Sequence, residues 1–135
     1  MSHISKVDTK IRDLTHLKKA LQALGIAYDE AKEGETLTLL GYEKHEVMED
    51  CIMEIKTNCK YGVGVRKKGE NLEIVADWWA IETFTGEKQE DFLNRITRQY
   101  AYETIMDKVK GLGYEVVQEE QDARENVRIT VRRWN

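Results

Sequence analysis

The sequence predicts an α+β fold, because two stretches of the chain repeat one helix-then-strand pattern 88 residues apart. In each stretch, apolar residues at helical spacing precede a glycine, Gly25 or Gly113, which opens an apolar strand. A charged turn and a further strand then follow. The pattern predicts two pseudo-repeated β-α-β-β units that form an antiparallel sheet with two helices on one face, an arrangement of ferredoxin-like type. The helical positions are Leu14, Leu17, Leu21 and Leu24 in the first stretch and Tyr102, Ile105, Val109 and Leu112 in the second.

The first unit contains a strand, a helix and a hairpin. Residues 3–11 alternate in character and predict a modest strand at an edge of the sheet. Asp13 stands where an N-cap accepts a backbone N–H, and Gly25 supplies the left-handed residue that ends the helix. Residues 28–31 and 37–42 flank the turn 32–35 and predict a hairpin.

The rest of the chain predicts an extra central hairpin, a long helix and a final hairpin. Residues 43–50 are polar and predict a loop, and residues 51–58 alternate as a strand does. The central hairpin joins strands 61–66 and 72–78, and a turn follows at 83–86. The helix extends from about residue 87 to residue 110. The final hairpin turns around 121–126, with Val127, Ile129 and Val131 facing inward.

Length and charge favour one globular domain over residues 1–135. The 41 % of hydrophobic residues fits a globular protein. The net charge of −4 disfavours broad binding to nucleic acid. The N-terminus lacks the apolar run of a signal peptide, and no segment approaches the ~20 apolar residues of a membrane span. Two cysteines are too few for a disulfide framework. We therefore expect a cytoplasmic protein without membrane association.

No motif in the sequence pairs a nucleophile with a base, so we predict no catalytic residues, no metal site and no cofactor. Cys51, Cys59 and His45 lack the close spacing and fourth ligand of a structural zinc site. Cys51 is expected in the core, while Cys59, beside Lys60, has some features of a reactive thiol. The glycines of 62–64 resemble a phosphate-binding loop, but their place in a strand favours close packing instead.

Three groups of residues are predicted to form surfaces for a partner or ligand. Trp79 has the opposite parity to Trp78 and is expected to anchor an interface beside Asp77. The second group is a helical stripe of Arg95, Arg98 and Tyr102. The third is a basic face on the last strand, with Arg128 and Arg132, and Trp134 nearby. The predicted residues are Asp77, Trp79, Arg95, Arg98, Tyr102, Arg128, Arg132 and Trp134.

Several segments resemble one family across nearly the whole chain. They include the opening Met-Ser-His, Ile-Arg-Asp-Leu at 11–14, Val-Ala-Asp at 75–77, Phe-Leu at 92–93, Arg-Gln-Tyr-Ala-Tyr at 98–102 and Arg-Arg-Trp at 132–134. The family is hypothetical chloroplast reading frame thirty-five, also catalogued as domain of unknown function 1257. The resemblance implies relatives in cyanobacteria and algal plastids, with the plastid stroma as the location in algae. It also implies an ATPase of the AAA class as a partner, and it implies no catalytic residues.

The leading hypothesis is a module that acts through protein contacts, as a homo-oligomer, as an accessory to an AAA-class ATPase, or as both. A small-ligand or enzymatic domain is the first alternative, with a pocket between sheet and long helix near Tyr100, Tyr102, Asp77 and Arg98. RNA binding by the arginine face at Arg128 and Arg132 is a weaker alternative.

Overall fold

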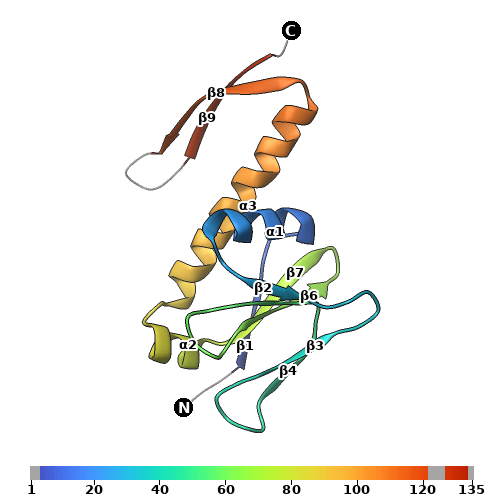
Figure 1. The fold of residues 1–135 in the computed structure, drawn as a ribbon, viewed down its shortest axis with the longest axis vertical. Helices are drawn as coiled ribbons and strands as arrows, with labels where there is room; N and C mark the ends of the chain where they lie inside the picture. The colour runs from blue at the N-terminus through green and yellow to red at the C-terminus, as the bar shows by residue number, and fades with distance from the viewer. Residues whose placement is uncertain (1–3, 122–126, 134–135) are drawn as a thin grey trace.

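A computed structural model describes residues 4–121 and 127–133 (Figure 1). Five strands form an antiparallel sheet in the order β1-β7-β6-β5-β2, so β6 is its central strand. The bounds are Ile4–Asp8 (β1), Asn71–Asp77 (β7), Val63–Lys68 (β6), Met53–Ile55 (β5) and Tyr28–Glu30 (β2).

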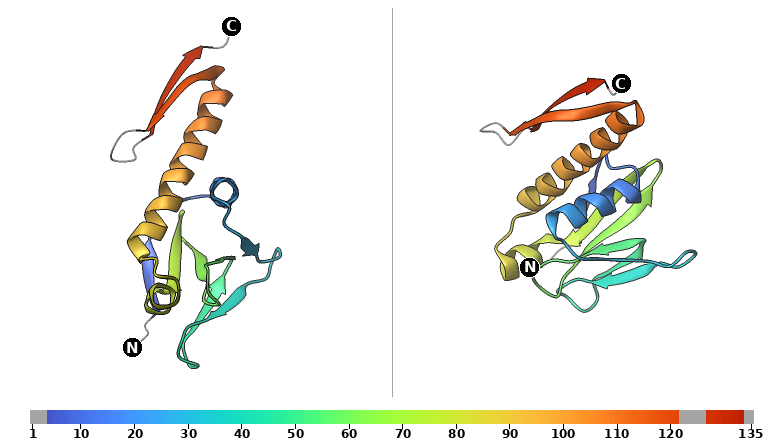
Figure 2. Two further views of the ribbon diagram at one scale, coloured as in Figure 1. Left: turned by 60° about the vertical axis from the view of Figure 1, so that its left-hand side comes forward. Right: turned by 45° about the horizontal axis from the view of Figure 1, so that its top comes forward.

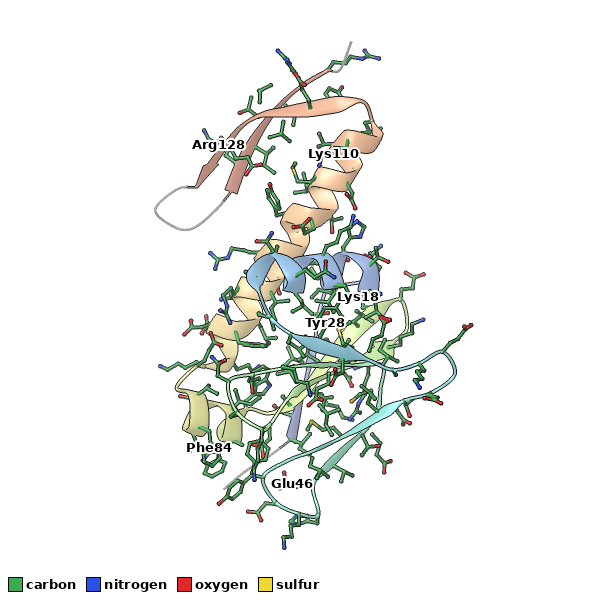
Figure 3. All side chains as sticks on the ribbon, in the orientation of Figure 1. Lys18, Tyr28, Glu46, Phe84, Lys110 and Arg128 are labelled. Carbon is green, nitrogen blue, oxygen red and sulfur yellow. The ribbon has the colours of Figure 1, made fainter. Side chains whose placement is uncertain are left out.

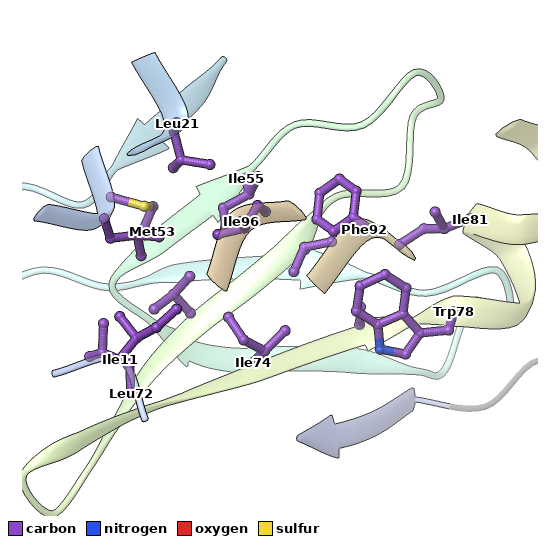
Figure 4. Close-up of a cluster of buried hydrophobic side chains, with 14 of the residues drawn as sticks. Ile11, Leu21, Met53, Ile55, Leu72, Ile74, Trp78, Ile81, Phe92 and Ile96 are labelled. Atoms are coloured by element: carbon purple, nitrogen blue, oxygen red, sulfur yellow. The ribbon is translucent and has the colours of Figure 1, made fainter. Parts of the chain in front are cut away.

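Two helices cover one face of this sheet (Figure 2). Helix α1 (Leu14–Leu24) begins at Asp13, whose carboxylate accepts the His16 N–H at 2.9 Å, and ends at Gly25 with φ of 72°. Helix α3 (Gln89–Gly111) packs across α1. Side chains alternate along a strand, so every second residue of the sheet points toward these helices. The resulting core includes Ile11, Leu21, Met53, Ile55, Leu72, Ile74, Trp78, Ile81, Phe92 and Ile96 (Figure 4).

A hairpin covers the opposite face of the sheet. It consists of β3 (Leu37–Leu40) and β4 (Val47–Cys51), which pair with each other. A second buried cluster joins this hairpin to β7 through Leu39, Met48, Cys51 and Val75. Both faces of the central strands are therefore covered, by helices on one side and by a hairpin on the other.

A short helix connects the sheet to α3. Helix α2 (Trp78–Thr85) starts directly after β7 and ends at Gly86 with φ of 78°. The Trp78 ring is buried and meets the Phe92 ring edge-on at a centroid distance of 5.8 Å. This contact fixes α2 against the first turn of α3.

The last two strands lie outside the main sheet. Strands β8 (Tyr114–Gln121) and β9 (Val127–Arg133) pair with each other and form a separate two-stranded sheet. Helix α3 has 23 residues and is therefore about 34 Å long, which carries this hairpin away from the sheet (Figure 1). Within the described residues, no helix is long and apolar enough to span a bilayer.

The mixed α+β class is confirmed, with α1 and α3 on one face and β6–β7 as the central hairpin. The two pseudo-repeated units sharing one sheet are not confirmed, because β8 and β9 form a sheet of their own. The repeated pattern of apolar residues predicts which segments form helices and strands. It does not predict with which other strand each strand pairs.

Two further predictions for the middle of the chain are wrong. Residues 43–50 were expected to form a loop, yet they contain most of β4, whose apolar residues Met48 and Cys51 are buried. Trp78 was expected to end a strand, yet it begins α2.

Gly64 is the position where the hairpin approaches the sheet most closely. A Cβ atom there would lie 2.6 Å from Cys51 Sγ and 2.9 Å from Val75 Cγ1. We expect Gly64→Ala to lower the free energy of unfolding by about 1–3 kcal/mol, because both neighbours are buried and held in place. Urea unfolding measures this loss.

Gly111→Ala is the matched control, since a Cβ at the last residue of α3 meets no atom within 4 Å. We expect this control to leave the stability unchanged or to raise it by up to about 1 kcal/mol. Equal stability of Gly64→Ala and the wild type would contradict the close packing described above.

Candidate functional site

The carboxylate of Asp77 joins three segments of the chain. Asp77 ends β7 and is fully buried. Its Oδ1 accepts the Ala80 N–H at 3.1 Å and caps α2, while its Oδ2 accepts the Tyr42 N–H at 2.9 Å. Because both bonds hold backbone groups, Asp77 fixes the start of α2 against the segment that follows β3.

Four aromatic rings meet at this junction, and we call them the aromatic surface: Tyr42, Tyr61, Trp79 and Phe84. Tyr42 lies edge-on to Trp79 with centroids 5.0 Å apart, and Tyr61 stacks on Phe84 at 5.7 Å. Tyr61 is buried, whereas the other three rings are 39 to 52 % exposed. Exposed aromatic residues gathered in one patch are typical of protein-interaction surfaces.

A cleft of about 420 Å³ borders the aromatic surface. One wall is the end of β3 and its continuation to Tyr42, and the other wall contains Glu54 and residues 60–62. The Lys60 ammonium lies 5.3 Å from the centre of the Tyr61 ring, a distance typical of a cation–π contact. Glu54 forms an ion pair with Lys56 at 2.9 Å. The lining residues are Thr38, Leu39, Leu40, Gly41, Tyr42, Lys44, Glu54, Lys60, Tyr61 and Gly62.

A cluster of polar side chains joins α1 to α3 on the other side of the sheet. His16 places Nδ1 at 2.7 Å from Asp13 Oδ2 and Nε2 at 2.7 Å from Asp107 Oδ2. Lys19 also donates to Asp107, at 2.6 Å. The Tyr100 hydroxyl donates to Asp13 Oδ1 at 2.8 Å. We call these five residues the interhelical cluster.

The interhelical cluster favours a protonated His16. Burial lowers the pKa of His16, but the hydrogen bonds to the Asp13 and Asp107 carboxylates outweigh it and raise the pKa above its ordinary value of 6.5. Burial also raises the pKa of Asp13, yet hydrogen bonds from His16 and Tyr100 outweigh it and hold the pKa below its ordinary value. Hydrogen bonds from Lys19 and His16 lower the pKa of Asp107.

This arrangement stabilises the contact between two helices. A general base needs a ring nitrogen that can receive a proton from a substrate. Both ring nitrogens of His16 are already within hydrogen-bonding distance of carboxylates from α3 and from the start of α1. We therefore assign the interhelical cluster to the packing of α1 on α3.

Asp77 and Trp79 were predicted to belong to one surface, but the structure gives them different roles. Asp77 is an internal cap that positions the backbone, whereas the Trp79 ring is part of the exposed aromatic surface. Trp79 owes its exposure to its place in the first turn of α2 and not to strand parity.

The predicted stripe of Arg95, Arg98 and Tyr102 is divided among different contacts. Arg95 forms an ion pair with Glu87 at 3.1 Å and lines a shallow groove along α3 together with Arg98. The Tyr102 hydroxyl donates to Glu119 of β8 at 2.6 Å. That hydrogen bond, together with burial, raises the pKa of Tyr102 to about 12.

The predicted arginine face lies on β9. Arg132 forms an ion pair with Glu115 of β8, and Arg128 lies opposite Glu120 in the strand register. Trp134 lies outside the described residues.

The four residues of the predicted pocket between sheet and long helix do not converge. Tyr100 is in the interhelical cluster, Tyr102 contacts β8, and Asp77 faces the β3–β4 side of the sheet. The space between sheet and helix is filled by core side chains such as Phe92 and Ile96.

The cysteines and the central glycines have structural surroundings. Burial raises the pKa of the Cys51 thiol, which lies in the second buried cluster. The Cys59 sulfur is 3.3 Å from the Thr57 hydroxyl. In the described part of the chain, no group of three His, Cys, Asp or Glu side chains is placed to hold a metal ion. Gly64 gives room to Cys51, and Gly62 gives room to Glu54.

Sequence reasoning missed Tyr42, Tyr61 and Phe84 at the aromatic surface. It also missed Lys60 beside that surface and His16 with Asp107 in the interhelical cluster. The three surface residues come from separate segments, so no local pattern connects them. His16 and Asp107 are 91 positions apart, and only the packing of α1 on α3 brings them together.

Replacing Asp77 tests whether its carboxylate organises the aromatic surface. We expect Asp77→Ala to lower the free energy of unfolding by about 2–4 kcal/mol, because α2 loses its cap and the Tyr42 N–H loses its acceptor. Asp77→Asn keeps one acceptor oxygen and should lose less. Urea unfolding followed by tryptophan fluorescence measures the free energy of unfolding of both variants. An equal loss of stability in Asp77→Ala and Asp77→Asn would contradict separate contributions from the two carboxylate oxygens.

The interhelical cluster predicts a pH-dependent contribution of His16 to stability. The raised His16 pKa makes this contribution complete below pH 6.5 and lost as the pH rises through the folded-state value. The lowered Asp13 and Asp107 pKa values make their share complete above pH 3.8 and lost as the pH falls through their folded-state values. The wild type should therefore exceed His16→Ala in unfolding free energy by more at about pH 5.5 than at about pH 8.5.

His45→Ala is the matched control for this experiment, since His45 is exposed and forms no ion pair within the described residues. Its difference from the wild type should not change between the two pH values. A pH-independent deficit in His16→Ala would show that the charged contact with Asp13 and Asp107 does not stabilise the helices.

Comparison with known proteins gives the same family over nearly the full length. A family described as "Protein of unknown function (DUF1257)" matches residues 20–130. A protein of Cyanophora paradoxa named "Uncharacterized protein ycf35" is 32 % identical over 136 residues, covering 99 % of this chain and 98 % of the relative. Proteins of the same name are 30 % identical in Pyropia yezoensis, covering 100 % and 99 %, and 29 % identical in Guillardia theta, covering 99 % and 98 %.

These matches confirm the family that the sequence segments indicated. The matched region contains the end of α1, the whole of α2 and α3, and all strands of the main sheet except β1. The chain is similar to the ycf35 proteins and belongs to the DUF1257 family.

Proposed function

We propose that this chain is a protein-contact module that associates with a second copy of itself through its C-terminal arm. The arm is the part of α3 from Ile105 onward together with β8 and β9. The observation that carries the proposal is a set of large apolar side chains on the arm that are between 36 and 63 % exposed. They are Ile105, Leu112, Tyr114, Val117 and Val131.

The exposed helical residues of the arm face away from the core. Ile105 is nine positions from the buried Ile96, which at 3.6 residues per turn is about half a turn around the helix axis. Leu112 is seven positions further along and returns to the same side as Ile105. The apolar surface of α3 therefore changes sides where the helix leaves the body of the protein.

The hairpin of the arm is short of packing partners. Two-stranded hairpins are marginally stable in water and need further strands or a packed face. Within the described residues, β8 and β9 pair only with each other, and both hairpin edges are unpaired. The Tyr102–Glu119 hydrogen bond holds the hairpin near α3, but it leaves Val117 and Val131 exposed. Coverage by another molecule would supply the missing layer.

A second copy of the chain suits the arm in charge as well as in apolar character. The described strands carry three acidic residues on β8 and three arginines on β9. The charges of these two strands balance, so the hairpins of two copies can approach each other without net repulsion. A two-fold symmetric contact also covers the same apolar residues on both copies at once.

The other predicted partners have less support. Pairing of Arg132 with Glu115 leaves less positive charge on β9 for RNA to bind. The AAA-class ATPase and the cytoplasmic location stay predictions from the sequence and the family resemblance.

Light scattering after size-exclusion chromatography tests self-association of the full chain. We expect the wild type to form a dimer at micromolar concentration and Val117→Glu with Val131→Glu to be a monomer, because two buried charges would oppose the contact. Val47→Glu is the control, since Val47 is exposed on the β3–β4 hairpin and not on the arm. Circular dichroism verifies that each variant is folded.

Cross-linking gives a second measurement, which does not require a substitution that disrupts the contact between two arms. Val131→Cys, in a background with Cys51→Ser and Cys59→Ser, should form a covalent dimer through a short bifunctional thiol reagent, whereas Val47→Cys should not. A monomeric wild type at all concentrations, or equal association of the wild type and the arm variant, would contradict the proposal.

A further inference from the structure

We propose that the cleft beside the aromatic surface binds an extended peptide of a partner protein, one that carries an apolar side chain next to acidic residues. This site is separate from the arm. Figure 3 shows Phe84 and Glu46 at one end of the molecule and Lys110 and Arg128 at the other. The inference therefore does not depend on self-association.

The cleft lies along a strand that has a free side. Within the described residues, β3 pairs only with β4, and the cleft is lined by consecutive residues of β3 and its continuation, 38–42. An unpaired strand edge offers main-chain N–H and C=O groups to an incoming extended segment, which adds to the sheet as a further strand. The volume of about 420 Å³ is large enough to hold side chains of such a segment.

The walls of the cleft supply an apolar contact. Leu40 is 61 % exposed beside the cleft, and the rings of Tyr42 and Tyr61 line it. The hydrogen bond from Tyr42 N–H to Asp77 holds the Tyr42 backbone. Contacts with Trp79 and Phe84 hold the Tyr42 and Tyr61 rings in position. A ring that is fixed before binding loses little conformational entropy when a ligand binds.

The arrangement of the rings favours a peptide over a nucleotide. A nucleobase binds by stacking on the face of an aromatic ring. Here Tyr61 and Phe84 stack on each other, and Tyr42 is in ring contact with Tyr61, Trp79 and Phe84. These mutual contacts occupy ring surface on which a nucleobase would stack, and the aliphatic surface beside them suits apolar side chains.

The charge of the cleft favours acidic residues in the ligand. Lys44 and Lys60 both line the cleft, and neither forms an ion pair within the described residues. The acidic residue of the lining, Glu54, is already paired with Lys56. The cleft therefore presents two available ammonium groups against one compensated carboxylate, so carboxylates of a peptide are attracted to it.

Selection from a phage-displayed library of linear random peptides provides the probe. Full-length protein is the bait, and an enriched peptide is then synthesised with a fluorophore for anisotropy titration. We expect enriched sequences to contain an apolar residue next to Asp or Glu. Lys44→Glu with Lys60→Glu should bind the peptide roughly tenfold or more weakly, because both attractive charges are reversed.

A control variant carries the same change in net charge away from the cleft. Lys10→Glu with Lys32→Glu reverses two exposed lysines that lie neither in the cleft nor on the arm, and it should bind the peptide as the wild type does. Amide chemical shifts in a titration with the peptide should change at residues 38–42 and 60–62. The arm variant Val117→Glu with Val131→Glu should also bind normally, which separates this inference from self-association.

Three results would overturn the inference. The first is a selection that enriches no peptide above an empty support. The second is binding that is equally strong in the cleft variant and in its control. The third is a set of shift changes at 38–42 and 60–62 with ATP but not with any selected peptide, which would assign the cleft to nucleotides.

Discussion

The length of α3 is the constraint on which the arrangement of the whole chain depends. The helix is about 34 Å long, whereas β7, the longest strand of the main sheet, has 7 residues and spans about 23 Å. Phe92 and Ile96 hold the first half of the helix against the sheet, so its second half extends beyond it. The chain has left the sheet before β8 begins, and the last hairpin must obtain its stability elsewhere.

Local patterns in the sequence were sufficient for most helices and strands but not for their partners. Asp13, Gly25 and the pattern of the central hairpin gave correct predictions, because each reports the conformation of its own segment. The prediction that β8 and β9 join the main sheet concerned contacts between distant parts of the chain. It was not confirmed, because the long α3 carries both strands away from that sheet. The α2 helix was missed because its cap, Asp77, stands inside a run that alternates like a strand.

The same distinction explains the candidate site. Trp79 was predicted at a surface, and it is there, but the rings beside it come from the end of β3, the segment before β6 and the end of α2. Their meeting depends on the two hydrogen bonds of Asp77, a residue that sequence reasoning placed on the surface itself. A buried carboxylate that positions backbone groups has no signature in a single sequence.

Hydrogen–deuterium exchange of β8 and β9 at two protein concentrations tests most directly whether another copy completes the arm. If a second molecule covers this hairpin, its amides exchange slowly in concentrated protein and faster on dilution, while β6 and β7 exchange slowly at both concentrations. Exchange in β8 and β9 that is the same at both concentrations would contradict the account.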